Sequence, residues 1–107
     1  MSKLSSIAAS MRSTIADKPA AWVSQPLPGG LEIVLSHREE SWRLALRRLD
    51  VYPSDTEVDV CSRVFGVPEG TEPLRHRSND RSNDRVAHYH IVELNWREIE
   101  LPCAATL

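Results

Sequence analysis

Hydrophobic residues near the start of the chain recur with the spacing of an amphipathic helix. The apolar stripe consists of Leu4, Ile7, Ala8, Met11 and Ile15, and the opposite face is mostly serine, threonine and arginine. Pro19 ends the pattern, because the residue before a proline is disfavoured in the helical conformation. We therefore predict a helix over residues 2–18, held by packing of its stripe rather than by helix propensity.

The next two segments show the pattern of short strands. Residues 21–27 predict one strand, and Pro26 within it favours the edge of a sheet, since proline donates no ladder hydrogen bond. A Pro-Gly-Gly turn at 28–30 leads to residues 31–36, where every second residue is a large aliphatic one. Together these segments predict a hairpin.

The segment 39–50 fits either a helix or a strand. As a helix it leaves Leu44 exposed, whereas as a strand it buries Trp42, Leu44 and Leu46 on one face. The polar residues 37–41 also suit a hairpin loop after the preceding strand. We predict a strand here.

A second helix has clear start and stop signals. Ser54 and Glu57 form the S-x-x-E capping box, and Gly66 is a natural C-terminal stop. We predict a helix over 55–65, with Cys61 on its buried stripe as a small hydrophobic residue rather than a nucleophile.

Residues 67–85 show no hydrophobic periodicity. The tetrapeptide Ser-Asn-Asp-Arg occurs twice in tandem here, at 78–81 and at 82–85. A long aperiodic segment with a duplicated polar motif is typical of a tolerant loop. We predict a flexible polar loop over 67–85.

The last ordered region, 86–101, is rich in strand-forming residues. Its more apolar positions alternate, which places one set on the core: Val86, His88, His90, Val92, Leu94 and Trp96. We expect the tail 102–107 to fray.

These elements predict one small α+β domain over residues 1–107, in the order α-β-β-β-α-β, with strands and the capped helix filling 20–66. The expected sheet is mostly antiparallel with the helices packed on one face. The last strand follows a helix, so the sequence leaves open a parallel pairing with one of the first three. A chain of 107 residues fits a single domain with one modest core.

Composition excludes several classes. The two cysteines, Cys61 and Cys103, form no CxxC motif or disulfide framework, and no apolar run is long enough to span a membrane. The first sixteen residues are serine-rich and free of acids, as in organellar transit peptides, but we interpret them as the first helix. We expect a cytoplasmic protein.

The His88-Tyr89-His90 sequence is the first chemical hypothesis. Two histidines at i and i+2 of a strand project to the same side, where they can share a divalent metal ion or act as acid and base. A metal site needs a third ligand, such as an acidic residue or His37. The alternative is a pair of hydrogen-bonded histidines in a mixed core.

Arginine supplies eleven of the thirteen Lys and Arg residues, which is the second hypothesis. A band of arginines could neutralise nucleic-acid phosphates, and its members are Arg43, Arg47, Arg48, Arg75, Arg77, Arg81 and Arg85. The net charge of −2 and the acids Asp80 and Asp84 beside the loop arginines argue against this.

The chain has no nucleotide-binding, hydrolase or metalloprotease motif, so we predict no catalytic residue and no cofactor beyond a divalent metal at the histidine pair. We favour a small non-catalytic accessory module that docks a protein partner or self-associates. An accessory protein that binds nucleic acid through the arginine band, and a metal-binding or metal-dependent protein that uses His88 and His90, are the alternatives.

Overall fold

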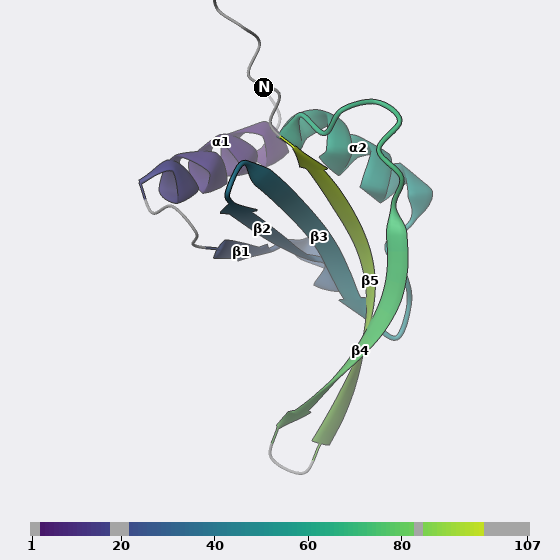
Figure 1. Ribbon diagram of the computed structural model, residues 1–107. Coiled ribbons are helices and arrows are strands. Elements are labelled where there is room, and N and C mark those ends of the chain that lie inside the picture. Colours follow the sequence, from purple (N-terminus) through teal and green to yellow (C-terminus); the bar gives the residue numbers. More distant parts are fainter. Residues whose placement is uncertain (1–2, 18–21, 83–84, 98–107) are drawn as a thin grey trace, which may run out of the picture.

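The computed structural model describes residues 3–17, 22–82 and 85–97. Two helices and five strands follow one another along the chain (Figure 1): α1 (Lys3–Ala16), β1 (Trp22–Pro26), β2 (Glu32–Arg38), β3 (Ser41–Leu49), α2 (Asp55–Phe65), β4 (Leu74–Ser82) and β5 (Arg85–Arg97). The strands form one antiparallel sheet in the order β1-β2-β3-β5-β4. Both helices contribute to a hydrophobic core on one face of this sheet, which confirms the predicted α+β class.

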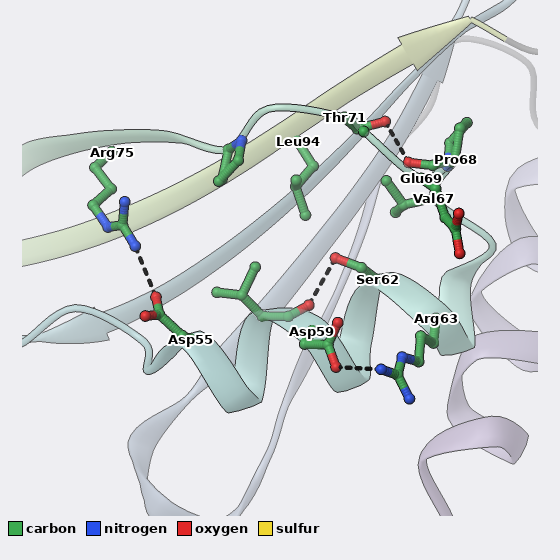
Figure 2. Close-up of a pocket in the computed structure, with 13 residues that line it drawn as sticks. Asp55, Asp59, Ser62, Arg63, Val67, Pro68, Glu69, Thr71, Arg75 and Leu94 are labelled. Carbon is green, nitrogen blue, oxygen red and sulfur yellow. Dashed lines mark hydrogen bonds and ion pairs between the residues drawn. The ribbon is translucent and has the colours of Figure 1, made fainter.

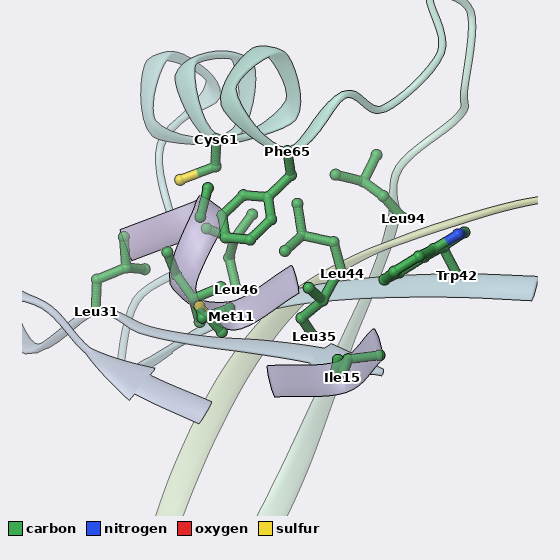
Figure 3. Packing of buried hydrophobic residues seen from close by; sticks show 12 residues of the cluster. Met11, Ile15, Leu31, Leu35, Trp42, Leu44, Leu46, Cys61, Phe65 and Leu94 are labelled. Atoms are coloured by element: carbon green, nitrogen blue, oxygen red, sulfur yellow. The ribbon is translucent and has the colours of Figure 1, made fainter. Parts of the chain in front are cut away.

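The core lies between the two helices and the central strands (Figure 3). Leu44 and Leu46 of the sheet are fully buried, and so are Ile15 of α1 and Phe65 of α2. Ala8 and Met11 are also buried, so the predicted stripe of the first helix is confirmed. The helix ends predicted at residues 2 and 18 lie outside the described residues.

Helix α2 has the predicted bounds because its ends are capped by side chain and backbone. The Ser54 hydroxyl accepts from the Glu57 N–H at 3.1 Å, and the Glu57 carboxylate accepts from the Ser54 N–H at 2.8 Å. Gly66 ends the helix with φ +74°, a conformation that costs glycine little. Among the described residues, no helix is long and apolar enough to cross a membrane.

The strand predictions for the first half of the chain are also confirmed. β1 lies at an edge of the sheet, as Pro26 indicated, and the ambiguous segment 39–50 forms strand β3. Glu39 and Glu40 make the tight turn between β2 and β3, both with positive φ. Residues 20 and 21 lie outside the described residues.

Strand β5 pairs with β3 in the antiparallel direction, so a parallel pairing is excluded. Its predicted core face is correct where helices cover it, since Val92 and Leu94 are buried. Val86 and His88 of the same set are exposed because they lie beyond the helices. Residues 98–101 and the predicted tail 102–107 lie outside the described residues.

The prediction of a flexible loop over 67–85 is wrong for residues 74–82, which form strand β4 along the outer edge of β5. The first copy of the tetrapeptide lies in this strand, and the second begins at Ser82 of β4 and ends at Arg85 of β5, with residues 83–84 outside the described residues. All β4 residues with a described exposure are solvent-exposed. A strand with no buried face needs no alternation of hydrophobic residues, so the sequence pattern gave no signal.

Strands β4 and β5 continue beyond the rest of the sheet as a two-stranded ribbon (Figure 1). The last pair between β3 and β5 is Leu49 with Tyr89, whereas β4 and β5 stay paired as far as Ser82 with Arg85. We use the name ribbon for residues 79–82 and 85–88, which have no third strand beside them.

Candidate functional site

The register of β4 and β5 brings the histidine pair and one arginine together in a single pocket. Arg77 pairs with His90 and Asn79 pairs with His88, and paired residues project to the same face of an antiparallel sheet. These four residues and Asp50, which follows β3, line a pocket of about 490 Å³. The two chemical hypotheses of the sequence thus concern one place in the fold. We call it the ribbon pocket.

The two histidines of the ribbon pocket differ in their hydrogen bonding. Nδ1 of His88 lies 2.7 Å from Oδ1 of Asn79, an oxygen that can only accept a hydrogen bond, so Nδ1 is the donor. The His90 ring packs edge-on against Tyr52, with ring centroids 4.7 Å apart. Nδ1 of His90 is buried and has no hydrogen-bond partner.

Arg77 is an unpaired cation, in contrast to the other candidate arginines with described side chains. It makes no ion pair or hydrogen bond within the part of the chain that the structure describes. The others are ion-paired, namely Arg43 with Glu93 (2.7 Å), Arg75 with Asp55 (2.9 Å), Arg47 with Glu32 and Arg48 with Glu57. Asp50 lines the same pocket but forms no ion pair with Arg77.

The candidate arginines do not form one continuous band. Strand alternation places Arg43 and Arg47 on the face of the sheet away from the helices, where Arg47 stacks over the Tyr89 ring at 4.3 Å. Arg48, Arg75 and Arg77 lie on the helix side of the sheet, and the first two pair with α2. Arg81 and Arg85 lie in the ribbon opposite Val86 and Ser82. Among the candidate arginines with described side chains, Arg77 alone shares a pocket with the histidines.

A metal ion is poorly matched to the ribbon pocket. The described residues include no group of three or more His, Cys, Asp or Glu side chains that could hold a metal ion. His37, the proposed third ligand, instead stacks on Trp42 at the other end of the sheet, with ring centroids 4.2 Å apart. The Arg77 guanidinium repels cations. Arginine and imidazole N–H groups are donors that suit an anion instead.

The backbone of β4 presents an open edge next to this pocket. The His88 carbonyl accepts from the Asp50 N–H at 3.0 Å, so it points toward β3 and away from β4. Asn79 and His88 are therefore a pair without mutual backbone hydrogen bonds. Because such pairs alternate, the backbone N–H and C=O groups of Arg75, Arg77 and Asn79 all face outward from the sheet.

A neighbouring groove holds the start of β4 against helix α2 (Figure 2). Val58, Val67 and Leu94 contribute apolar surface to its lining, and its volume is about 390 Å³. The ion pair between Arg75 and Asp55 bridges β4 and α2 at one end. The ion pairs of Arg75 with Asp55 and of Arg63 with Asp59 neutralise these charges, so the groove explains how β4 is anchored rather than what it binds.

A third recess lies on the sheet face away from the helices. Its lining includes Trp22 of β1, which is 66% exposed, together with Arg43, Arg47, Ala45 and Ile91. Both arginines are already ion-paired there, with Glu93 and Glu32. The exposed tryptophan escaped the sequence analysis, because an edge-strand aromatic looks the same whether it faces the core or water.

Cys61 offers no nucleophile. Its side chain is in the hydrophobic core, as predicted, and burial followed by the charge of Glu57 raises the pKa of the thiol to about 11. A thiol with such a pKa is almost entirely protonated at neutral pH.

The pairing of Arg77 with His90 could not be derived from spacing, because it depends on the turn that closes the hairpin. One signal was available: Asn83-Asp84 is a two-residue segment of types that suit tight turns, and it is flanked by the paired residues Ser82 and Arg85.

No family model, curated protein or solved structure matches the chain.

Proposed function

We propose that this chain is a non-catalytic interaction module that docks a partner protein by accepting an extended segment along β4. The observation that carries the proposal is the open edge of β4, where Arg75, Arg77 and Asn79 direct their backbone groups outward. Strand addition satisfies such groups with main-chain hydrogen bonds, and side-chain pockets beside the edge supply specificity. The ribbon pocket is such a neighbour.

The ribbon supports the same proposal through its stability. Residues 79–82 and 85–88 form a ladder of only two strands, and two-stranded hairpins are marginally stable in water. A segment added to β4 supplies a third strand. Docking therefore stabilises a part of the chain that the core does not reach.

The charges of β4 favour a different protein over a second copy. Arginine recurs at positions 75, 77 and 81, so antiparallel registers of two copies bring arginine opposite arginine. With Ser78 on the twofold axis, for example, Arg75 lies opposite Arg81. Like charges directly opposite each other destabilise a sheet, and charged edges are a known protection against self-pairing.

Selection of binding peptides tests the proposal without knowledge of the partner. Short random peptides displayed on phage are selected against the full chain and then synthesised. We expect the selected peptides to slow hydrogen exchange at the backbone amides of Arg75, Arg77 and Asn79, because those N–H groups become hydrogen-bonded. Absence of binders, or protection confined to other elements, would contradict strand addition at β4.

Two substitutions at Asn79 separate the backbone from the side chain. Asn79→Pro removes an outward-facing N–H but no hydrogen bond to β5, and proline is tolerated on edge strands in that orientation. Asn79→Ala is the matched control, since it loses the same contact with His88 and keeps the N–H. We expect at least a tenfold loss of peptide affinity for the proline variant relative to the alanine variant. Equal affinities would overturn the proposal.

Nucleic-acid binding is the second candidate, and the ribbon is the observation that favours it. A two-stranded β-ribbon fits the major groove of DNA, and the ribbon contains Arg81 and Arg85. The acids Asp80 and Asp84 and the net charge of −2 oppose it. Titration of the full chain with duplex DNA across a salt series distinguishes the two candidate functions. Tight, salt-dependent binding that is lost in an Arg81→Ala, Arg85→Ala double variant would replace the protein-docking proposal.

A further inference from the structure

We propose that the ribbon pocket binds a carboxylate side chain of the docked segment, so that the partner of this module is an acidic extended peptide. This inference rests on the proposed function and assigns a chemical class to the partner. It combines one unpaired arginine with two histidines that the fold places on the same face.

The geometry of strand addition fixes where the partner's side chain lies. Arg77 directs its backbone groups to the open edge, so a strand added there pairs with it through hydrogen bonds. The partner residue opposite Arg77 then has its Cα about 5.5 Å away, and its side chain projects to the face of the ribbon pocket. An aspartate or glutamate at that position lies within reach of the guanidinium.

The donors of the ribbon pocket are available for a carboxylate. Arg77 has no partner among the described residues, and a guanidinium binds a carboxylate through two parallel hydrogen bonds. His90 lines the same pocket opposite Arg77, so protonation of its imidazole adds a second positive charge beside the guanidinium. Arg48, the neighbour of His90 in β3, is held by Glu57 and does not compete for the ligand.

The charges around the histidines determine how binding responds to pH. His88 faces Asn79 and Asp50, and His90 faces Arg77, Arg48 and Tyr52. With both imidazoles neutral, the unpaired charges of the pocket are Arg77 and Asp50, which balance. Protonation of either imidazole adds a positive charge to the pocket, so a carboxylate binds more strongly when the histidines are protonated. The negative charge of Asp50 opposes the ligand.

A single-carboxylate compound tests the pocket independently of strand addition. N-acetylglutamate N-methylamide is titrated into the labelled full chain and followed by NMR, with the corresponding glutamine compound as the neutral control. We expect millimolar binding that shifts the Arg77 side-chain N–H and the ring signals of His88 and His90, and binding at least threefold tighter at pH 5.5 than at pH 7.5. The glutamine compound should shift none of these signals.

Three variants assign the binding to the pocket. We expect Arg77→Met to weaken binding of the glutamate compound at least tenfold, and Asp50→Asn to tighten it severalfold because a like charge is removed. Asparagine also tolerates the positive φ of +62° at position 50. Arg63→Met is the matched control, since Arg63 is an exposed arginine of α2 paired with Asp59, and it should leave binding unchanged.

The outcomes separate this inference from the proposed function. If peptides add to β4 but the glutamate compound leaves Arg77 and the histidines unshifted, the carboxylate assignment is wrong and strand docking stands. If the compound binds but no peptide protects β4, the pocket stands and strand docking fails. Inorganic phosphate binding at the same residues more tightly than the glutamate compound would reassign the pocket to phosphate and overturn the acidic peptide.

Discussion

The guanidinium of Arg48 donates two hydrogen bonds to the carboxylate of Glu57, which joins the end of strand β3 to the first turn of helix α2. Nη1 of Arg48 lies 2.8 Å from Oε1 of Glu57, and Nη2 bonds to Oε2. Oε1 also accepts the backbone N–H of Ser54 at 2.8 Å. One carboxylate therefore completes both an ion pair between elements and the capping box. The hydrogen bond from Arg48 is the main reason that the pKa of Glu57 falls to about 2.

Glu57→Gln should lower the free energy of unfolding by about 1–2 kcal/mol at pH 7, because the charge-assisted contact with Arg48 is lost from a partly exposed site. Urea denaturation measures this change. Ser54→Ala is the control that removes the side-chain cap alone, at a cost of about 1 kcal/mol. A Glu57→Gln variant as stable as the wild type would show that the ion pair contributes nothing.

Glu93 should make stability fall at acidic pH. Its hydrogen bond from Arg43 is the main cause that lowers the pKa from 4.5 to about 2, and Asn95 and His76 act in the same direction. A carboxylate whose pKa is lower in the folded state stabilises the protein above its unfolded pKa. That stability is lost as the pH falls from about 4.5 toward 2.

The comparison of wild type with Glu93→Gln measures this contribution. Urea denaturation at pH 6, 4 and 3 should show a difference in unfolding free energy that is largest at pH 6 and shrinks at pH 3. The glutamine variant cannot lose a charge that it does not have. A difference that stays constant over this range would assign the effect of the substitution to packing instead of ionisation.

The sequence predicted well those elements whose position is determined by residues within or directly beside them. Ser54, Glu57 and Gly66 are enough to place both ends of α2, because capping depends on residues within one turn. Pro26 similarly placed β1 at an edge. For the segment 39–50 the exposure of Leu44 decided between helix and strand, and Leu44 is fully buried in β3.

Strand β4 and the ribbon pocket could not be predicted, because they depend on the register in which β4 pairs with β5. The tandem tetrapeptide contains the dipeptide Asn-Asp twice, at 79–80 and 83–84, so the sequence offers two turn positions. Each position implies a different partner for Arg77. The observed register pairs Ser82 with Arg85, which selects the second position and sets Arg77 opposite His90. Both positions have the same local sequence, so local sequence alone cannot choose between them.

Cys61 should react very slowly with thiol reagents in the folded protein. Burial raises the pKa of its thiol from 9.0 to about 11, which lowers the thiolate fraction at pH 8 about 100-fold. The measurement is the rate of reaction with Ellman's reagent at pH 8, in native buffer and in urea, for a Cys103→Ser variant that retains only this thiol. Native and unfolded rates within tenfold of each other would contradict the buried position.

The ribbon should open locally far more easily than the core sheet. Asp80 and Ala87 are paired within the two-stranded ladder, where no third strand or helix covers them, whereas Leu44 lies in the centre of the sheet. Native-state hydrogen exchange should give opening free energies below about 2 kcal/mol for the amides of Asp80 and Ala87. Leu44 should approach the free energy of global unfolding.

Docking of a peptide should reduce the difference in opening free energy between the ribbon and the core sheet. A peptide that adds to β4 should raise the protection of the Ala87 amide, which faces β4 and not the peptide, because the ribbon can open only after the peptide leaves. Protection of Asp80 and Ala87 equal to that of Leu44 in the free protein would show that the ribbon is stable by itself. The need for a third strand would then no longer support docking at β4, and the open backbone edge beside Arg77 would have to support it alone.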